Sequence, residues 1–248
     1  GSPQSEFSSE VLVDELAEKI GMDPLEFRYL NCYRPGSTSP TGHGFDVHPF
    51  PELLDMMRPK YQEALEKARK ESTPDKKRGV GISLGTYNVG SDTADAAGSD
   101  IELNPDGSVT IYNTWEDHGQ GADIGTVSTA HEALRPLGIA PEQIHLDMND
   151  TAYCPNSGCA AASRCQYMVG NAIVDSANKL MDAMRKPDGT FRTYDEMVAE
   201  GIPTRYSGAY TIADKGTTVI DPKTGQYNPV PTYMYAVFMS EVEVDVKT

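Results

Sequence analysis

The segment 115–125, WEDHGQGADIG, carries residue types that can do chemistry at a ligand. Its glycines Gly119 and Gly121 let the backbone approach a ligand closely or take positive φ values. Gln120, between them, holds out a carboxamide that both donates and accepts hydrogen bonds. The start of the helix that follows offers free N–H groups, which suit an anion. For so short a motif, a tight turn with a polar cap is the alternative interpretation.

A second segment of the same kind lies at 159–166, CAAASRCQ, where small residues precede a long apolar stripe of helical spacing. Ser163 and Gln166 have the spacing of a helix capping box. Arg164 adds a permanent charge and a five-donor fork suited to phosphate. Alternatively, Arg164 covers the first helical turn and pairs with an acid. Together, the two segments predict that two turns face one anionic ligand.

Strands and helices must position these turns. Alternating apolar residues predict a hairpin over 100–114, with its turn at 104–107. Helices are expected after each of the two segments, up to Arg135 and from Ser163. The remaining expected strands cover 79–89, 144–148, 205–212 and 233–246.

The N-terminal part reads as helical. Apolar residues share one face of a helix over 5–20, namely Phe7, Val11, Leu12, Leu16 and Ile20. Asp23 caps a second helix, in which Phe27 and Leu30 are expected to face the core. Two short helices are expected at 51–58 and 60–71, before a turn at 72–75. We therefore expect an α+β fold, with an N-terminal helical segment (1–75) packed on a mixed α/β sandwich (76–248) that includes the terminal strand.

Composition narrows the function classes. The chain has 248 residues, 38% of them hydrophobic, which is enough for one large or two small domains. Its formal net charge of −16 argues against nucleic acid and anionic membrane surfaces as partners. It has no apolar run of membrane-spanning length. Because the first residue is not Met and the long terminal strand ends without a hairpin, we expect a piece of a longer protein.

The four cysteines are Cys32, Cys154, Cys159 and Cys165. The last three have the spacing C-x4-C-x5-C, which fits neither a zinc site nor the usual ferredoxin patterns. We therefore predict no metal ligands, and reduced thiols of the kind found in cytoplasmic proteins. The cytoplasm is the expected location, with the periplasm left open.

Several motifs, in order over the whole chain, resemble the molybdenum-binding large subunit of the xanthine oxidase and aldehyde oxidoreductase family, and most of all its bacterial aldehyde oxidoreductases. They are GSPQSEFSSE at 1–10, GMDPLEFR at 21–28, segment 115–125, PNSG at 155–158 with Ser163 and Arg164, and MSEVEVD at 239–245. Each motif is weak alone, and as a set they are specific.

The resemblance implies oxidative hydroxylation of an aldehyde or heterocycle, with oxygen from water, at a molybdenum held by molybdopterin. The cofactor is a cytosine dinucleotide or a mononucleotide, and the cytosine dinucleotide form is the one expected. By resemblance, Gln120 approaches the oxygen ligand of molybdenum, and Gly119 and Gly121 shape that loop. The remaining cofactor-binding residues it implies are Ala161, Ala162, Ser163, Arg164, Cys165 and Gln166. Cys165 stands where relatives carry Gln, which alters one cofactor contact.

The resemblance also implies a partial active site. The chain starts after the family's Arg-Gly-aromatic-Gly loop, and the general-base glutamate is expected beyond Thr248, so no catalytic residue is assigned here. We expect the isolated chain neither to retain the cofactor nor to turn over substrate. The expected partners are the remaining segments of the same subunit and iron–sulfur and flavin domains or subunits. The alternatives are a non-catalytic acidic interaction module and a thiol-based metal or redox protein.

Overall fold

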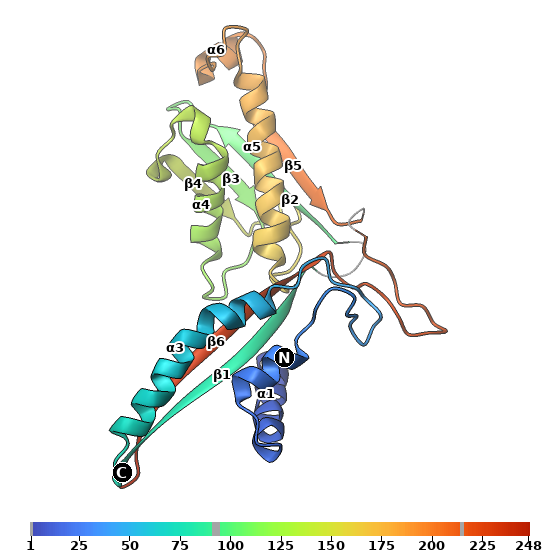
Figure 1. Cartoon of the computed structure of the whole chain (residues 1–248). Helices are drawn as coiled ribbons and strands as arrows, with labels where there is room; N and C mark the ends of the chain where they lie inside the picture. Colours follow the sequence, from blue (N-terminus) through green and yellow to red (C-terminus); the bar gives the residue numbers. More distant parts are fainter. Residues whose placement is uncertain (1, 91–94, 214–215) are drawn as a thin grey trace. The chain divides into compact units, whose positions relative to one another are not determined.

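The structure is a computed structural model that describes residues 2–90, 95–213 and 216–248. The chain divides into unit 1 (1–87, 221–226 and 233–248) and unit 2 (88–220 and 227–232). Figure 1 shows the elements, which are α1 (Ser2–Lys19), α2 (Pro24–Asn31), α3 (Phe50–Glu71), β1 (Lys76–Val89), β2 (Ala96–Leu103), β3 (Val109–Asn113), α4 (Ala122–Ala133), η1 (Arg135–Leu137), η2 (Pro141–Gln143), β4 (Ile144–Met148), η3 (Cys165–Val169), α5 (Gly170–Met184), α6 (Tyr194–Ala199), β5 (Arg205–Thr211) and β6 (Thr232–Asp245). The predicted α+β class is confirmed.

Unit 2 is built on a four-stranded mixed sheet of order β4-β3-β2-β5. The hairpin predicted over 100–114 is confirmed, because β2 and β3 pair antiparallel with Leu103 opposite Val109. The turn is closed by Gly107 N–H, which donates to Asn104 C=O at 2.9 Å. Strand β4 lies parallel to β3, and α4 forms the crossover between them.

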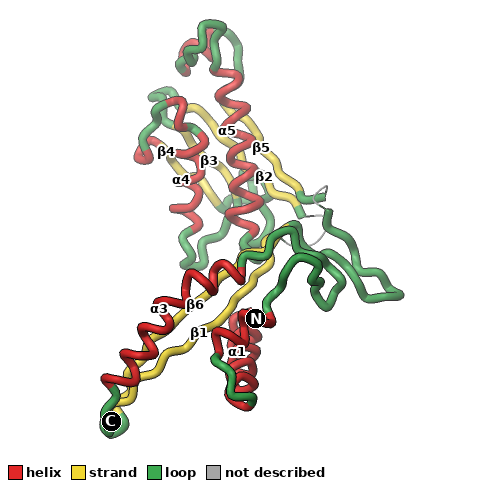
Figure 2. The backbone as a smooth tube through the Cα atoms, in the orientation of Figure 1, coloured by secondary structure: helices red, strands yellow, loops and turns green. Residues whose placement is uncertain are grey.

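Helices α4 and α5 cover one face of this sheet (Figure 2). Ile101 and Ile111 point into that layer and have no exposed surface. The predicted apolar stripe is confirmed as core, and its buried members include Met168, Val169, Ala172, Ile173, Ala177, Leu180, Met181 and Met184. Gly208 of β5 lets α5 approach closely, because a Cβ there would lie only 2.6 Å from Ser176 N.

In unit 1, α3 packs on a two-stranded sheet of β1 and β6. Leu54 and Tyr61 of α3 are buried in the cluster that also holds Ile82 of β1. The prediction of two short helices is wrong, because α3 runs without interruption through Pro59. A proline removes one backbone hydrogen bond, but the buried apolar face on both sides of Pro59 keeps the helix continuous.

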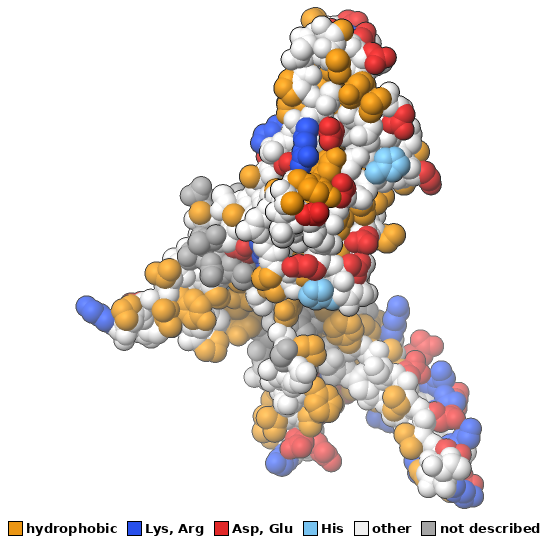
Figure 3. Space-filling model, turned by 180° about the vertical axis from the view of Figure 1, so that it is seen from behind, with side chains coloured by type: hydrophobic (Ala, Val, Ile, Leu, Met, Phe, Trp, Pro, Cys, Tyr) orange, Lys and Arg blue, Asp and Glu red, His pale blue; other side chains and the backbone are white. Residues whose placement is uncertain are grey.

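The N-terminal helix α1 exposes its apolar face. Phe7 is 72% exposed and Ile20 60%, while the only buried residue of α1 is Ala17. Hydrophobic side chains are visible at the surface of the arm that holds α1 in Figure 3. The expectation that Leu30 faces the core is also wrong, since Leu30 is 61% exposed. In its place Arg28, 2% exposed, forms ion pairs with Glu10 and Asp14, side chains that fix α1 to α2. Asp23 caps α2 as predicted.

The predicted boundary at residue 75 falls inside unit 1. Strands β1 and β6 pair with each other under α3 and do not join the sheet of unit 2, so the predicted sandwich is wrong in this respect. The terminal strand therefore has a partner, although the two strands lie far apart in sequence. Within the described residues, no helix combines the length and the apolar character needed to cross a membrane.

Candidate functional site

The two predicted turns lie at the same end of unit 2, where α4 and α5 begin (Figure 1). Gln166 Nε2, after the second turn, donates to Thr129 Oγ1 of α4 over 3.1 Å. A Cβ on Gly125 of α4 would lie 3.6 Å from Gln166 Oε1. The structure thus brings together the two predicted segments, since the contacting residues Thr129 and Gln166 are 37 residues apart in the sequence. We call 116–121 the first turn and 159–164 the second turn.

The first turn is exposed and has room beside it. Gly119 and Gly121 adopt φ values of 99° and 88°, and a Cβ on either would meet no atom within 4 Å. Gln120 folds back over the turn, where its Oε1 accepts from His118 N–H at 2.6 Å and its Nε2 donates to Glu116 C=O at 2.8 Å. The carboxamide is therefore held within its own turn, at the surface.

The start of α4 already carries an anion, the carboxylate of Asp117. Its Oδ1 accepts from Gly119 N–H at 2.7 Å and from Gly121 N–H at 3.2 Å, and its Oδ2 accepts from Asp123 N–H at 3.3 Å. These hydrogen bonds lower the pKa of Asp117, and the bond from Gly119 N–H has the largest effect. The prediction of free amides here is wrong. An Asp two residues before a glycine is a turn signal, so the sequence could have indicated this cap.

The second turn holds two consecutive non-glycine residues in the left-handed region, Ala162 (φ 48°) and Ser163 (φ 52°). Each such residue costs on the order of 1–3 kcal/mol. Ala162 C=O accepts from Gly90 N–H at 2.8 Å. Among the described residues, the N–H groups of Ala162 and Ser163 have no acceptor. This turn therefore offers a ligand two backbone donors.

The predicted capping box at Ser163 is wrong. Ser163 makes no capping bond, and the helical segment begins instead as the π-helical turn η3. Gln166 uses its amide on Thr129 and not on the backbone of Ser163. Ala161 is exposed like Ser163 and Gln166, and Cys165 is half-buried. Short π-helical turns are frequent at functional sites, and this one begins directly after the second turn.

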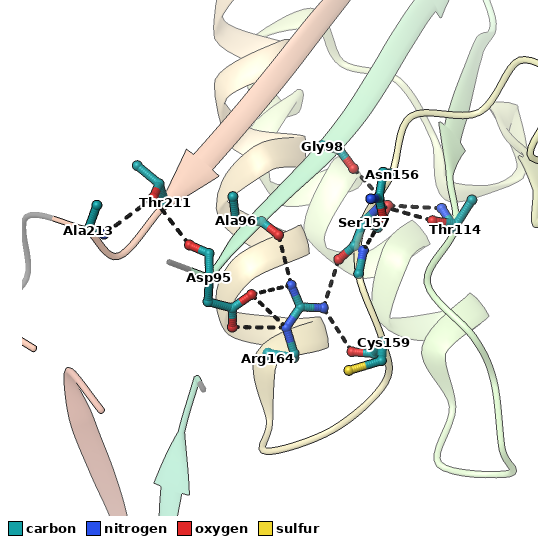
Figure 4. A network of polar contacts seen from close by, with 11 residues as sticks. Asp95, Ala96, Gly98, Thr114, Asn156, Ser157, Cys159, Arg164, Thr211 and Ala213 are labelled. Atoms are coloured by element: carbon teal, nitrogen blue, oxygen red, sulfur yellow. Dashed lines mark hydrogen bonds and ion pairs between the residues drawn. The ribbon is translucent and has the colours of Figure 1, made fainter. Parts of the chain in front are cut away.

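Arg164 is 2% exposed and pairs with Asp95, which is 8% exposed. Its Nε donates to both Asp95 oxygens at 3.0 Å, and its Nη2 donates to Asp95 Oδ1 at 2.6 Å and Ala96 C=O at 2.8 Å. Its Nη1 donates to Ser157 C=O and Cys159 C=O, both at 2.8 Å (Figure 4). The pKa of Arg164 is raised above its ordinary value, and the largest cause is the hydrogen bonding to Asp95.

All five N–H groups of Arg164 therefore have protein acceptors, as the alternative interpretation of this residue expects. A direct contact with a phosphate would require Arg164 to give up some of these bonds, and its role at a cofactor stays a prediction. Sequence reasoning missed Asp95, because nothing local marks a partner 69 residues away.

Ser157 links the two turns and was also missed. It is completely buried, and its Oγ accepts from Thr114 N–H at 2.9 Å and donates to Gly98 C=O at 2.8 Å. Its own N–H donates to Thr114 Oγ1 at 2.9 Å. Because Thr114 comes directly before Trp115, these bonds hold the approach to the first turn against the loop of the second (Figure 4).

None of the four cysteines forms a disulfide. Burial, followed by the charge of Glu116, raises the pKa of the Cys165 thiol to about 11. Cys159 is exposed. In the part of the chain that the structure describes, no group of three or more His, Cys, Asp or Glu side chains is placed to hold a metal ion.

The arrangement fits a polar ligand that lies against both turns. Trp115 Nε1 and Glu116 Oε2, buried at the start of the first turn, have no hydrogen-bond partner within residues 2–90, 95–213 and 216–248. The same holds for the N–H groups of Ala162 and Ser163 at the second turn. The glycines of the first turn leave space for a close approach. The site offers hydrogen-bond donors and open backbone, with the carboxylates of Glu116 and Asp117 beside them at the first turn.

Comparison with known proteins identifies the family of the chain. Residues 56–248 match the family model described as molybdopterin cofactor-binding domain. The whole chain is 55% identical to aldehyde oxidoreductase of Megalodesulfovibrio gigas, of which it covers 27%, and 28% identical to xanthine dehydrogenase of Drosophila subobscura, of which it covers 19%. The solved structure of aldehyde oxidoreductase from Desulfovibrio gigas superposes on the whole chain with a TM-score of 0.92 at 55% identity.

The chain thus spans about a quarter or less of the length of these relatives. The resemblance stated from its motifs is confirmed, and the match covers both turns. The chain belongs to the molybdopterin cofactor-binding domain family, as a partial chain similar to aldehyde oxidoreductase.

Proposed function

We propose that this chain forms part of the cofactor site of a molybdenum hydroxylase similar to aldehyde oxidoreductase, with both turns facing molybdopterin in its cytosine dinucleotide form. The cofactor, when bound, supplies the molybdenum at which an aldehyde or heterocycle is hydroxylated with oxygen from water. The observation that carries this proposal is the adjacency of two turns, one with open space beside its glycines and one with two backbone N–H groups that have no acceptor among the described residues. The family match over residues 56–248 supports it.

Each turn has a distinct part in the proposal. Gly119 and Gly121 allow the cofactor to approach the backbone, because no side chain fills the space beside them. Gln120 exchanges its bonds to His118 N–H and Glu116 C=O for bonds to the bound group. Such an exchange is inexpensive, because the carboxamide is exposed and water can replace either bond.

At the second turn, the N–H groups of Ala162 and Ser163 donate to cofactor oxygens. We assign Ala161, Cys165 and Gln166 to the same site, and of these Ala161 and Gln166 are exposed and Cys165 is half-buried. Arg164 acts mainly by holding the shape of the turn, since its donors are directed to protein oxygens.

The test compares two glycine variants in the full-length polypeptide that contains this chain. Gly121 (φ 88°) and Gly138 (φ 68°) are both left-handed, and a Cβ on either meets nothing within 4 Å. Gly121→Ala and Gly138→Ala therefore carry similar backbone strain and differ in whether they lie at the proposed site. We expect several-fold less molybdenum and pterin per polypeptide in Gly121→Ala than in Gly138→Ala. Equal cofactor content in the two variants would contradict the proposal.

We further propose that the isolated chain neither retains the cofactor nor turns over aldehydes. A dinucleotide cofactor needs several loops to bury it, and two are proposed here. The remaining segments of the polypeptide, together with iron–sulfur and flavin domains or subunits, complete the enzyme, and we place it in the cytoplasm. Metal analysis of the purified chain tests the first point, and stoichiometric molybdenum would refute it.

A further inference from the structure

The strained second turn is held in place from outside itself. Its left-handed residues Ala162 and Ser163 come directly before Arg164. The loop encloses the guanidinium group of Arg164, which is 2% exposed. Gly158 (φ 74°) lies so close to this group that a Cβ there would be 2.6 Å from Arg164 Cζ. The loop therefore closes directly on the guanidinium, and the position of that group sets the path of the loop.

Asp95 sets the position of the guanidinium. Its two carboxylate oxygens accept three hydrogen bonds from Arg164 Nε and Nη2. The other Arg164 donors then point at carbonyls on two separate segments, Ala96 of β2 and Ser157 and Cys159 of the loop (Figure 4). A buried charge pair of this kind holds its geometry, because an unpaired buried charge is costly.

We infer that Asp95 is a positioning residue of the cofactor site: through Arg164 it holds the backbone amides of Ala162 and Ser163 in the orientation that receives the cofactor. This inference rests on the proposed function and adds a residue outside both turns, whose side chain is 8% exposed. Through Ser157, the same network reaches Thr114 and so fixes the second turn against the first.

Loss of the Asp95 carboxylate should affect the loop of the second turn more than the core of unit 2. The core of unit 2 is built from the apolar stripe of α5 and from the sheet, and the side chain of Asp95 is not part of it. Releasing the guanidinium should therefore loosen the loop 157–163 and leave α5 in place. A neutral amide at position 95 offers one acceptor oxygen where the carboxylate offers two, and its NH2 group would face another set of donors.

The experiment uses the full-length polypeptide and three variants, Asp95→Asn, Asp95→Glu and Asp182→Asn. Asp182 lies exposed on α5 and provides the matched control for the change of carboxylate to amide. The measured quantity is the rate of hydrogen–deuterium exchange of backbone amides, which does not depend on enzyme activity. We expect amides over 157–166 to exchange about tenfold faster or more in Asp95→Asn, and to be accelerated more than the amides of α5. Asp95→Glu keeps the charge and should give an intermediate rate, which remains informative if Asp95→Asn does not fold.

Molybdenum content, measured on the same preparations, completes the test. It should fall several-fold in Asp95→Asn, fall less in Asp95→Glu, and stay at the wild-type value in Asp182→Asn. Unchanged exchange over 157–166, or equally faster exchange over α5, would overturn the inference, and so would a loosened loop that keeps all its molybdenum. A wild-type polypeptide that carries no molybdenum would instead refute the proposed function.

Discussion

The two turns each come directly before a helical segment, and they are stabilised in different ways. The first turn is capped locally by Asp117, whose carboxylate binds N–H groups two, four and six residues ahead of it. The second turn depends on a buried ion pair between Arg164 and Asp95, 69 residues apart. The first turn is exposed and the guanidinium of the second is enclosed.

This difference shows how a binding surface can leave its backbone free. In the first turn a side chain occupies the helix start, so what remains for a ligand is the glycine surface and the Gln120 carboxamide. In the second turn the charged side chain is buried, and the N–H groups of Ala162 and Ser163 have no acceptor among the described residues. The guanidinium that seemed suited to a ligand donates instead to the carbonyls of the loop.

The largest expected effect comes from Arg164→Met, which removes the guanidinium that pairs with the buried carboxylate of Asp95. We expect a loss of about 3–5 kcal/mol in the free energy of unfolding of unit 2, measured by chemical denaturation. The matched control is Arg135→Met, because Arg135 pairs with Glu132 at the surface, with 73% and 64% of the side chains exposed. It should change the free energy by less than about 1 kcal/mol. Similar losses in both variants would show that the buried pair has no special role.

Two glycine variants, Gly158→Ala and Gly119→Ala, compare the enclosed loop with the exposed turn, and their expected effects are smaller. Gly158→Ala combines a left-handed φ with a collision against the guanidinium, so we expect a loss of about 2–4 kcal/mol. Gly119→Ala has the unfavourable φ alone, with open space around the Cβ, and should cost about 1 kcal/mol. Thermal and chemical unfolding of both variants measure these losses. If Gly119→Ala were the more harmful change, the distinction between an exposed and an enclosed turn would be wrong.

Acid titration isolates the cap of the first turn. Because the pKa of Asp117 lies below its ordinary value of 3.8, its stabilising effect is complete above that pH and is lost as the pH falls through the lowered pKa. Asp117→Asn should therefore lower the melting temperature at pH 6 and lower it less at pH 3. Melting curves at the two pH values, with Asp182→Asn as control, measure this. An equal effect of Asp117→Asn at both pH values would contradict the assigned cap.

The smallest change is chemical and leaves the fold intact. Cys159 is exposed, whereas the pKa of Cys165 is raised to about 11, so few Cys165 thiolates exist at pH 8. We expect iodoacetamide to modify Cys159 at least about tenfold faster than Cys165, as measured by peptide mass spectrometry. Comparable rates at the two thiols would mean that the start of η3 is more open than the structure shows.

The sequence by itself determined the family, the hairpin, the apolar stripe of α5 and the two turns, because these depend on local patterns of residue type. Only the tertiary structure decided that β6 pairs with β1, that the apolar face of α1 is exposed, and that Arg164 binds Asp95. The physical reason is that a side chain's partner is chosen by what the fold brings near it. A guanidinium has the same five donors whether it faces a phosphate or a buried carboxylate 69 residues away.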